Sequence, residues 1–227
     1  DMRHASPLQR LPALALFAIA ALALAGGLAA QADISKVNGG IRLASGEQAG
    51  DLTTVNGGIR LSEQAAAGRI ETVNGGVSLE RGATAAAING VNGSIRLAEN
   101  ARVEGDLQGV NGAITLLEGA RVGGDLGNVN GTISLERAQV GGGLTTTNGS
   151  VLVGAGSRIQ GDLLVKRPRG TWNENRPPRV VIGPDAEVAG SLRFERPVRL
   201  YVHSSARTGR IDGATPERFD GEQPPAD

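Results

Sequence analysis

The chain has 227 residues and a formal net charge of zero, with 23 basic and 23 acidic side chains. It contains no cysteine, which excludes disulfides, thiolate zinc sites and a cysteine nucleophile. Glycine supplies 35 residues and aromatic residues only 2%. Because the glycines follow no three-residue period, their excess does not indicate collagen.

Residues 1–32 have the pattern of a signal peptide. A weakly basic start precedes the apolar run LPALALFAIAALALA, and AQA at residues 30–32 matches the small-residue pattern of a cleavage site. Cleavage after Ala32 would begin the mature chain at Asp33 and predicts an exported protein, periplasmic, secreted or at the cell surface. The alternative is an N-terminal membrane anchor, because the apolar run is about long enough to span a bilayer.

A seven-residue motif, VNGGIRL in its first copy, recurs through residues 33–163. The seven copies begin at Val37, Val55, Val73, Val91, Val110, Val129 and Thr147, at spacings of 18 or 19 residues. Apolar residues two or four positions apart follow the period of a strand, and a short, fixed repeat is typical of a solenoid. We therefore predict an all-β, single-stranded parallel β-helix in which equal residues stack about 4.8 Å apart. The Val, Ile and Leu of the motif are each expected to form a buried aliphatic ladder.

Polar residues occupy the predicted corners of the coil. The motif asparagines are expected to form a ladder in which each side-chain amide bonds the next: Asn38, Asn56, Asn74, Asn92, Asn111, Asn130 and Asn148. A column of aspartates follows glycine, at Asp51, Asp106, Asp125 and Asp162. We interpret these as turn residues that bond their own backbone rather than as a calcium site, which needs six or more converging oxygens.

The repeat continues past residue 163 in altered form. AEVAGSL at residues 186–192 repeats the pattern of ARVEGDL at 101–107, so residues 180–211 are predicted to form irregular turns. The solenoid would then span residues 33–211 in about nine turns, interrupted by a protruding Pro- and Asn-rich loop at 164–179. The tail at 212–227 is predicted to be disordered.

Two other architectures fit parts of the pattern. Asn-Gly between apolar segments is also a strong signal for antiparallel hairpins, although a meander gives no reason for identical residues at identical phase. The units also divide into hexads that resemble the left-handed hexapeptide acyltransferases. The fifth hexad position of that family is normally small, whereas here it alternates between Ile, Ala and Leu, which favours a right-handed coil.

At these residues the chain resembles two sets of bacterial proteins. The repeated VNGGI pattern is similar to putative adhesins built from β-strand repeats. The A-x-V-x-G-D-L unit resembles the bactofilins, polymer-forming proteins with a right-handed parallel β-helix. The likeness covers residues 37–211 and implies a coil that assembles with itself. Bactofilins are typically cytoplasmic, whereas this chain carries an export signal.

The sequence offers little catalytic chemistry. His203 is the one histidine after the predicted signal peptide, and it has no evident partner or pocket for general-base work. No catalytic, cofactor-binding or metal-binding residue is therefore predicted. An acyltransferase or a polysaccharide lyase remains the enzyme alternative.

Basic residues concentrate around the loop. Residues 33–163 hold 10 basic and 13 acidic side chains, net −3, whereas 164–210 hold 10 basic and 4 acidic, net +6. The candidate partner-binding residues are Lys166, Arg167, Arg169, Trp172, Arg176 and Arg179. Arginines beside a tryptophan suit an anionic glycan, lipid headgroups or a protein partner, and nucleic acid is not expected for an exported chain.

The predicted function is that of an exported, non-enzymatic scaffold or adhesin-like surface. A solenoid leaves a raw strand edge at each terminus unless something covers it, so self-polymerisation is expected as well. The alternative is a binding module that acts through the basic loop.

Overall fold

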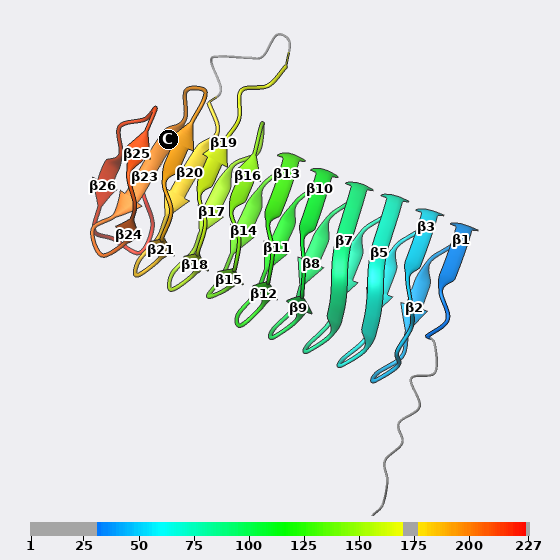
Figure 1. The fold of residues 1–227 in the computed structure, drawn as a ribbon. Helices are drawn as coiled ribbons and strands as arrows, with labels where there is room; N and C mark the ends of the chain where they lie inside the picture. The colour runs from blue at the N-terminus through cyan, green and yellow to red at the C-terminus, as the bar shows by residue number, and fades with distance from the viewer. Residues whose placement is uncertain (1–30, 170–176, 226–227) are drawn as a thin grey trace, which may run out of the picture.

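The computed structural model describes residues 31–169 and 177–225, and it confirms the predicted parallel β-solenoid. The described chain contains strands and turns but no helix, and every strand pair is parallel. Figure 1 shows the turns stacked into a rod, with the N-terminal strands at one end and the C-terminal strands at the other. Handedness stays a prediction.

Each turn contributes strands to three faces of the rod. The first face contains β1 (Ile34–Asn38), β3 (Leu52–Asn56), β5 (Ala66–Asn74), β7 (Thr84–Asn92), β10 (Leu107–Asn111), β13 (Leu126–Asn130), β16 (Leu144–Thr146), β19 (Leu163–Val165), β22 (Leu192–Phe194) and β25 (Ile211–Asp212). The second face is a ten-stranded sheet of β2 (Ile41–Leu43), β4 (Ile59–Leu61), β6 (Val77–Leu79), β8 (Ile95–Leu97), β11 (Ile114–Leu116), β14 (Ile133–Leu135), β17 (Val151–Val153), β20 (Arg179–Ile182), β23 (Arg199–His203) and β26 (Glu217–Phe219). The third face contains β9 (Arg102–Val103), β12 (Arg121–Val122), β15 (Gln139–Val140), β18 (Arg158–Ile159), β21 (Glu187–Val188) and β24 (Arg207–Thr208), and it continues into the first halves of β5 and β7.

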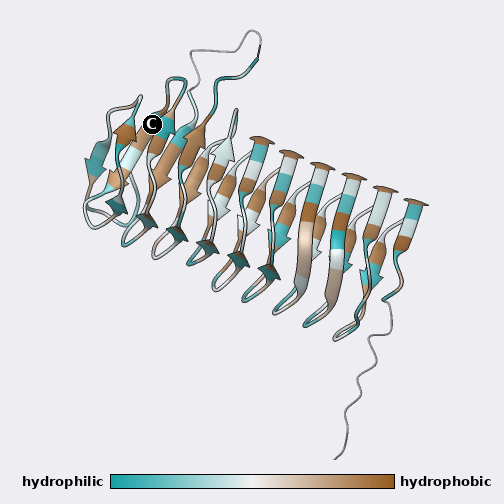
Figure 2. Ribbon diagram, in the orientation of Figure 1, coloured by the Kyte–Doolittle hydropathy of each residue, from teal (hydrophilic) through white to brown (hydrophobic). Residues whose placement is uncertain are grey.

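The register between turns matches the sequence repeat. Ile41 pairs with Ile59 and Leu43 with Leu61, and the same Ile and Leu columns continue through later turns. These side chains are almost fully buried. Because they are apolar, they appear as regular brown bands along the strands in Figure 2. One continuous core therefore runs along the rod, and no single turn could bury its apolar face alone.

The valine of the motif is an exception, because it faces solvent. Val37 is 67% exposed, and the valines of the next five copies are between 37% and 41% exposed. The prediction of a buried valine ladder is therefore wrong. In β3, Leu52 and Thr54 point inward, so the alternation of the strand turns Val55 outward.

A partly polar column takes the inward position that valine was expected to fill. Thr54, Thr72 and Asn128 are buried there, and each donates to a corner carbonyl: Thr54 Oγ1 to Gly39 O at 3.2 Å, Thr72 Oγ1 to Gly57 O at 3.4 Å, and Asn128 Nδ2 to Gly112 O at 2.9 Å. These bonds satisfy carbonyls that the tight Asn-Gly corner leaves without a strand partner.

The C-terminal segment differs from the sequence prediction. Part of the tail that was predicted to be disordered forms β26, which pairs with β23 and adds a tenth strand to the second face. Phe219 is buried against Val181 and Tyr201 in a small cluster outside the main core. The tail lacks long apolar runs, so nothing in the sequence indicated this strand, which Phe219 and the pairing with β23 dock onto the coil.

Candidate functional site

The predicted partner-binding residues do not form one cluster. Lys166, Arg167 and Arg169 follow β19 on the first face and are exposed, whereas Arg179 begins β20 on the second face. Trp172 and Arg176 lie outside the described residues. Figure 1 shows the ends of the loop rising away from the rod. The proposed role of these residues in binding stays a prediction.

Two of these arginines have structural contacts. Arg167 donates its backbone N–H to Glu195 Oε2 and its Nε to Glu195 O, both at 3.2 Å. The Arg179 guanidinium lies 4.5 Å from the centre of the Tyr201 ring and donates to Pro225 O at 2.8 Å. Arg167 therefore anchors the base of the loop, and Arg179 holds the C-terminal tail against the second face.

The predicted asparagine ladder is present. Each Nδ2 donates to the Oδ1 of the asparagine one turn earlier, over six bonds of 2.7–3.1 Å that join Asn38, Asn56, Asn74, Asn92, Asn111, Asn130 and Asn148. The seven asparagines lie at the corner between the first and second faces. The ladder therefore joins successive turns at this corner of the coil.

Arg196 ends this ladder, and sequence reasoning missed it. It is only 6% exposed and donates Nη1 to Asn148 Oδ1 at 2.9 Å and to Thr147 O at 3.2 Å. The charged donor thus satisfies the last amide oxygen of the row. Its separation of 48 residues from Asn148 hid the pair from any local pattern.

Removing this contact should destabilise the C-terminal turns. We expect Arg196→Ala to lower the free energy of unfolding by about 2 kcal/mol, because the C-terminal turns lose the charge-assisted hydrogen bonds that the buried guanidinium donates to Asn148 and Thr147. Arg193→Ala is the control, since Arg193 is an exposed residue of β22. Urea unfolding followed by circular dichroism would measure both, and equal midpoints would contradict this role for Arg196.

The aspartate column bonds between turns. Asp51 Oδ1 accepts Arg69 N–H at 2.7 Å, Asp106 Oδ1 accepts Asp125 N–H at 2.8 Å, and Asp162 Oδ1 accepts Ser191 N–H at 2.7 Å. The expectation that each aspartate bonds its own backbone is therefore wrong, because the stacked corner of the next turn is the nearer donor. Among the described residues no group of His, Cys, Asp or Glu could hold a metal ion.

His203 is occupied by local contacts. Its Nδ1 accepts the backbone N–H of Ser205 at 3.1 Å, and its ring packs edge-on to Phe219 with 5.0 Å between centroids. The side chain thus helps to dock the last strand.

Exposed ion pairs join neighbouring turns elsewhere on the rod. Hydrogen bonding to Arg137 and its positive charge lower the pKa of Glu118, and the same interactions with Arg207 lower the pKa of Glu187. The Arg137–Glu118 distance is 2.7 Å and the Arg207–Glu187 distance is 3.0 Å. These pairs contribute little to stability because solvent screens them.

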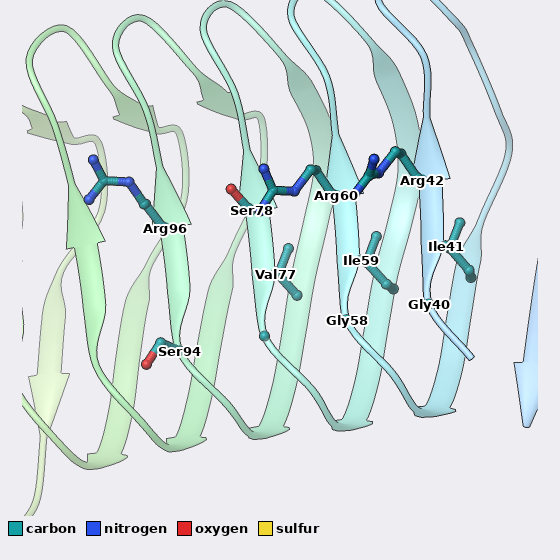
Figure 3. A pocket seen from close by; sticks show the side chains of 11 residues that line it. Gly40, Ile41, Arg42, Gly58, Ile59, Arg60, Val77, Ser78, Ser94 and Arg96 are labelled. Atoms are coloured by element: carbon teal, nitrogen blue, oxygen red, sulfur yellow. The ribbon is translucent and has the colours of Figure 1, made fainter. Parts of the chain in front are cut away.

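Two hollows lie on the outer side of the second face. One, of about 560 Å³, covers the N-terminal turns and is lined by Arg42, Arg60, Arg96 and a row of glycines (Figure 3). The other, of about 870 Å³, lies near the C-terminal turns and includes Leu152, Val181 and the tail at 222–224. The first is basic and the second mainly apolar, so the two ends of this face differ in chemistry.

The first and last strands of the coil each carry a charged residue that the sequence analysis did not predict. Lys36 pairs in register with Thr54 and so occupies the inward column of β1, yet it is exposed, with Nζ 3.0 Å from Gly40 O. Arg218 pairs with the fully buried Val202 and is likewise exposed. At each end of the coil, a cation therefore occupies an inward-facing column, and the residue of that column in the neighbouring turn is buried and uncharged.

Comparison with known proteins adds no relative. No family model matches the chain, and no curated protein or solved structure shows significant similarity to it. The resemblance to bactofilins and β-repeat adhesins therefore stays a prediction. Over residues 31–169 and 177–225 the structure has no helix long and apolar enough to cross a membrane.

Proposed function

We propose that this chain is an exported, non-enzymatic rod that acts as a structural scaffold or adhesin-like surface of fixed length. The observation that carries the proposal is the single uninterrupted core, which joins all the described turns through parallel ladders. Such a coil has no domain boundary at which to bend, so its faces keep a constant spacing along the rod. Export is inferred from the sequence of residues 1–32.

The charged ends support a fixed length over open-ended growth. Stacking one copy on another would bury Lys36 and Arg218 in the joint without an opposite charge, at a cost of several kcal/mol per ion. Inward-pointing charges at sheet edges are a known means of preventing edge-to-edge pairing. Self-polymerisation, which the sequence predicted, is thus disfavoured in our proposal.

Electron microscopy of residues 33–227 tests the shape. Ten stacked strands span nine steps, so the rod should be about 43 Å long at the strand spacing. We expect short particles of uniform length. Filaments would contradict a fixed length, and globular particles would contradict the rod itself.

The second candidate is a binding module that acts through the basic loop. Exposure of Lys166 and Arg169, which follow β19 at the start of the loop, supports it. Neutralising both with glutamine should then abolish retention on an anionic glycan or on anionic lipid vesicles, with no change in circular dichroism. Unchanged retention on both would reject the loop as the site.

A further inference from the structure

A row of arginines runs along the outer side of the second face. Arg42, Arg60, Ser78 and Arg96 are the middle residues of β2, β4, β6 and β8, and they pair in register from turn to turn. Figure 3 shows the three guanidinium groups on the same side of the sheet, with Ser78 between the second and the third. Four turns at the strand spacing extend this row over about 14 Å.

The charges of this row are poorly balanced by the protein itself. Arg42 and Arg60 are directly opposed on neighbouring strands, an arrangement that destabilises a sheet. Arg60 Nη1 has a partner in Glu80 Oε1 at 3.1 Å. Within residues 31–169 and 177–225, no carboxylate lies within ion-pair distance of Arg42 or Arg96. Lys36 Nζ, close to Gly40, adds a further positive charge at the N-terminal end of the row.

The floor beside the row is made of glycines. Gly40, Gly58 and Gly76 line the hollow, and none of them has a positive φ. The equivalent residues of later turns are Ser94, Ala113, Thr132 and Ser150, so those turns accept a side chain at this position. In the first turns the approach is closer: an added Cβ would lie 2.9 Å from a carbonyl oxygen of the next turn at Gly40 and Gly76, and 3.2 Å at Gly58. Glycine in the first three turns therefore opens the hollow of about 560 Å³ next to the arginines.

The chemistry of the groove suits a linear acidic polymer. Guanidinium groups bind carboxylates through paired hydrogen bonds, and the hydroxyls of Ser78 and Ser94 can bond neutral hydroxyls of a ligand. A flat floor beside a straight row of cations accepts an extended chain that carries anions at intervals. We propose that the groove formed by Arg42, Arg60, Arg96 and the glycine floor binds an acidic polysaccharide along the axis of the rod.

Nucleic acid fits the same groove less well. Sequence-independent binding of single strands combines basic side chains with aromatic residues on which bases stack. Residues 33–163, which form this part of the rod, contain no aromatic residue. The proposal goes beyond the scaffold function and does not depend on the assembly state of the rod.

The third face provides an internal control of equal charge. Arg102, Arg121 and Arg158 are exposed, and Arg102 is directly opposed to Arg121 in the same way as Arg42 to Arg60. None of the three lines the basic hollow. A triple glutamine variant on either face removes the same charge. Comparing the two variants therefore distinguishes binding in the groove from general electrostatic attraction between the rod and an anionic ligand.

The test is binding of polygalacturonate to residues 33–227, measured by calorimetry at low salt. We expect Arg42→Gln/Arg60→Gln/Arg96→Gln to weaken binding about tenfold or more, and the third-face triple variant to change it less than about twofold. Gly58→Thr, which introduces the residue found at Thr132, should also weaken binding although it alters no charge. Neutral dextran should not bind.

Four results would overturn the proposal. These are no binding of polygalacturonate by the unaltered rod, equal losses in the two triple variants, loss only in the Lys166→Gln/Arg169→Gln loop variant, and tighter binding of single-stranded DNA through the same arginines. Circular dichroism and sedimentation of each variant show whether the fold and the assembly state are unchanged. A failure of glycan binding is thereby distinguished from a failure of the rod.

Discussion

Replacing both terminal cations should convert the rod into an end-to-end polymer. In Lys36→Thr/Arg218→Val, each cation becomes the uncharged residue that its register partner carries, Thr54 or Val202. The joint would then bury no unpaired charge, and the open strand edges of two copies could pair. We expect the sedimentation coefficient of the double variant to rise with concentration, and filaments to appear by electron microscopy.

Three further variants serve as controls. Each single substitution leaves one cation in every joint and should remain monomeric, as should the charge-preserving Lys36→Arg/Arg218→Lys. One apolar column already favours the joint, because Ile34 and Ile211 end the same column of the first face at opposite ends of the rod. A double variant that keeps its β-sheet circular dichroism yet stays monomeric would show that the charges do not limit assembly.

In the second copy of the motif, Gly57 should be irreplaceable and Gly58 replaceable. Gly57 has a φ of +155°, and a Cβ there would overlap the backbone of Gly39 and Gly40 in the preceding turn. A Cβ on Gly58 would lie 3.2 Å from Gly76 O, a spacing that later turns accommodate with Ser94 and Ala113. We expect Gly57→Ala to cost about 3 kcal/mol or more.

The paired substitution Gly58→Ala should cost less than about 1 kcal/mol, since no strained backbone is involved. Chemical denaturation of the two variants beside the unaltered protein measures the difference. Equal midpoints for the two alanine variants would contradict the close approach of successive turns at this corner.

Much of the fold followed from periodicity alone. Repeats of 18 or 19 residues predict which residues stack, and the Ile, Leu and Asn columns lie in the predicted register. Periodicity does not determine which way a residue faces when one strand runs on into a corner. Val55 was misassigned for this reason, because its direction depends on Leu52 three residues earlier.

The candidate sites were harder to predict because the surroundings of each residue depend on its position along the rod. Arg42, Arg60 and Arg96 share one column of the repeat, which was visible in the sequence, but the hollow beside them depends on the neighbouring glycines. Arg218 belongs to an inward-facing column only because it pairs with Val202. No copy of the sequence repeat covers Arg218, so this pairing could not be predicted.

The central claim is that the rod limits its own length, and sedimentation velocity of residues 33–227 tests it most directly. We predict one elongated monomeric species whose sedimentation coefficient stays constant over a wide range of concentration. A coefficient that rises with concentration, accompanied by filaments of variable length, would contradict the claim.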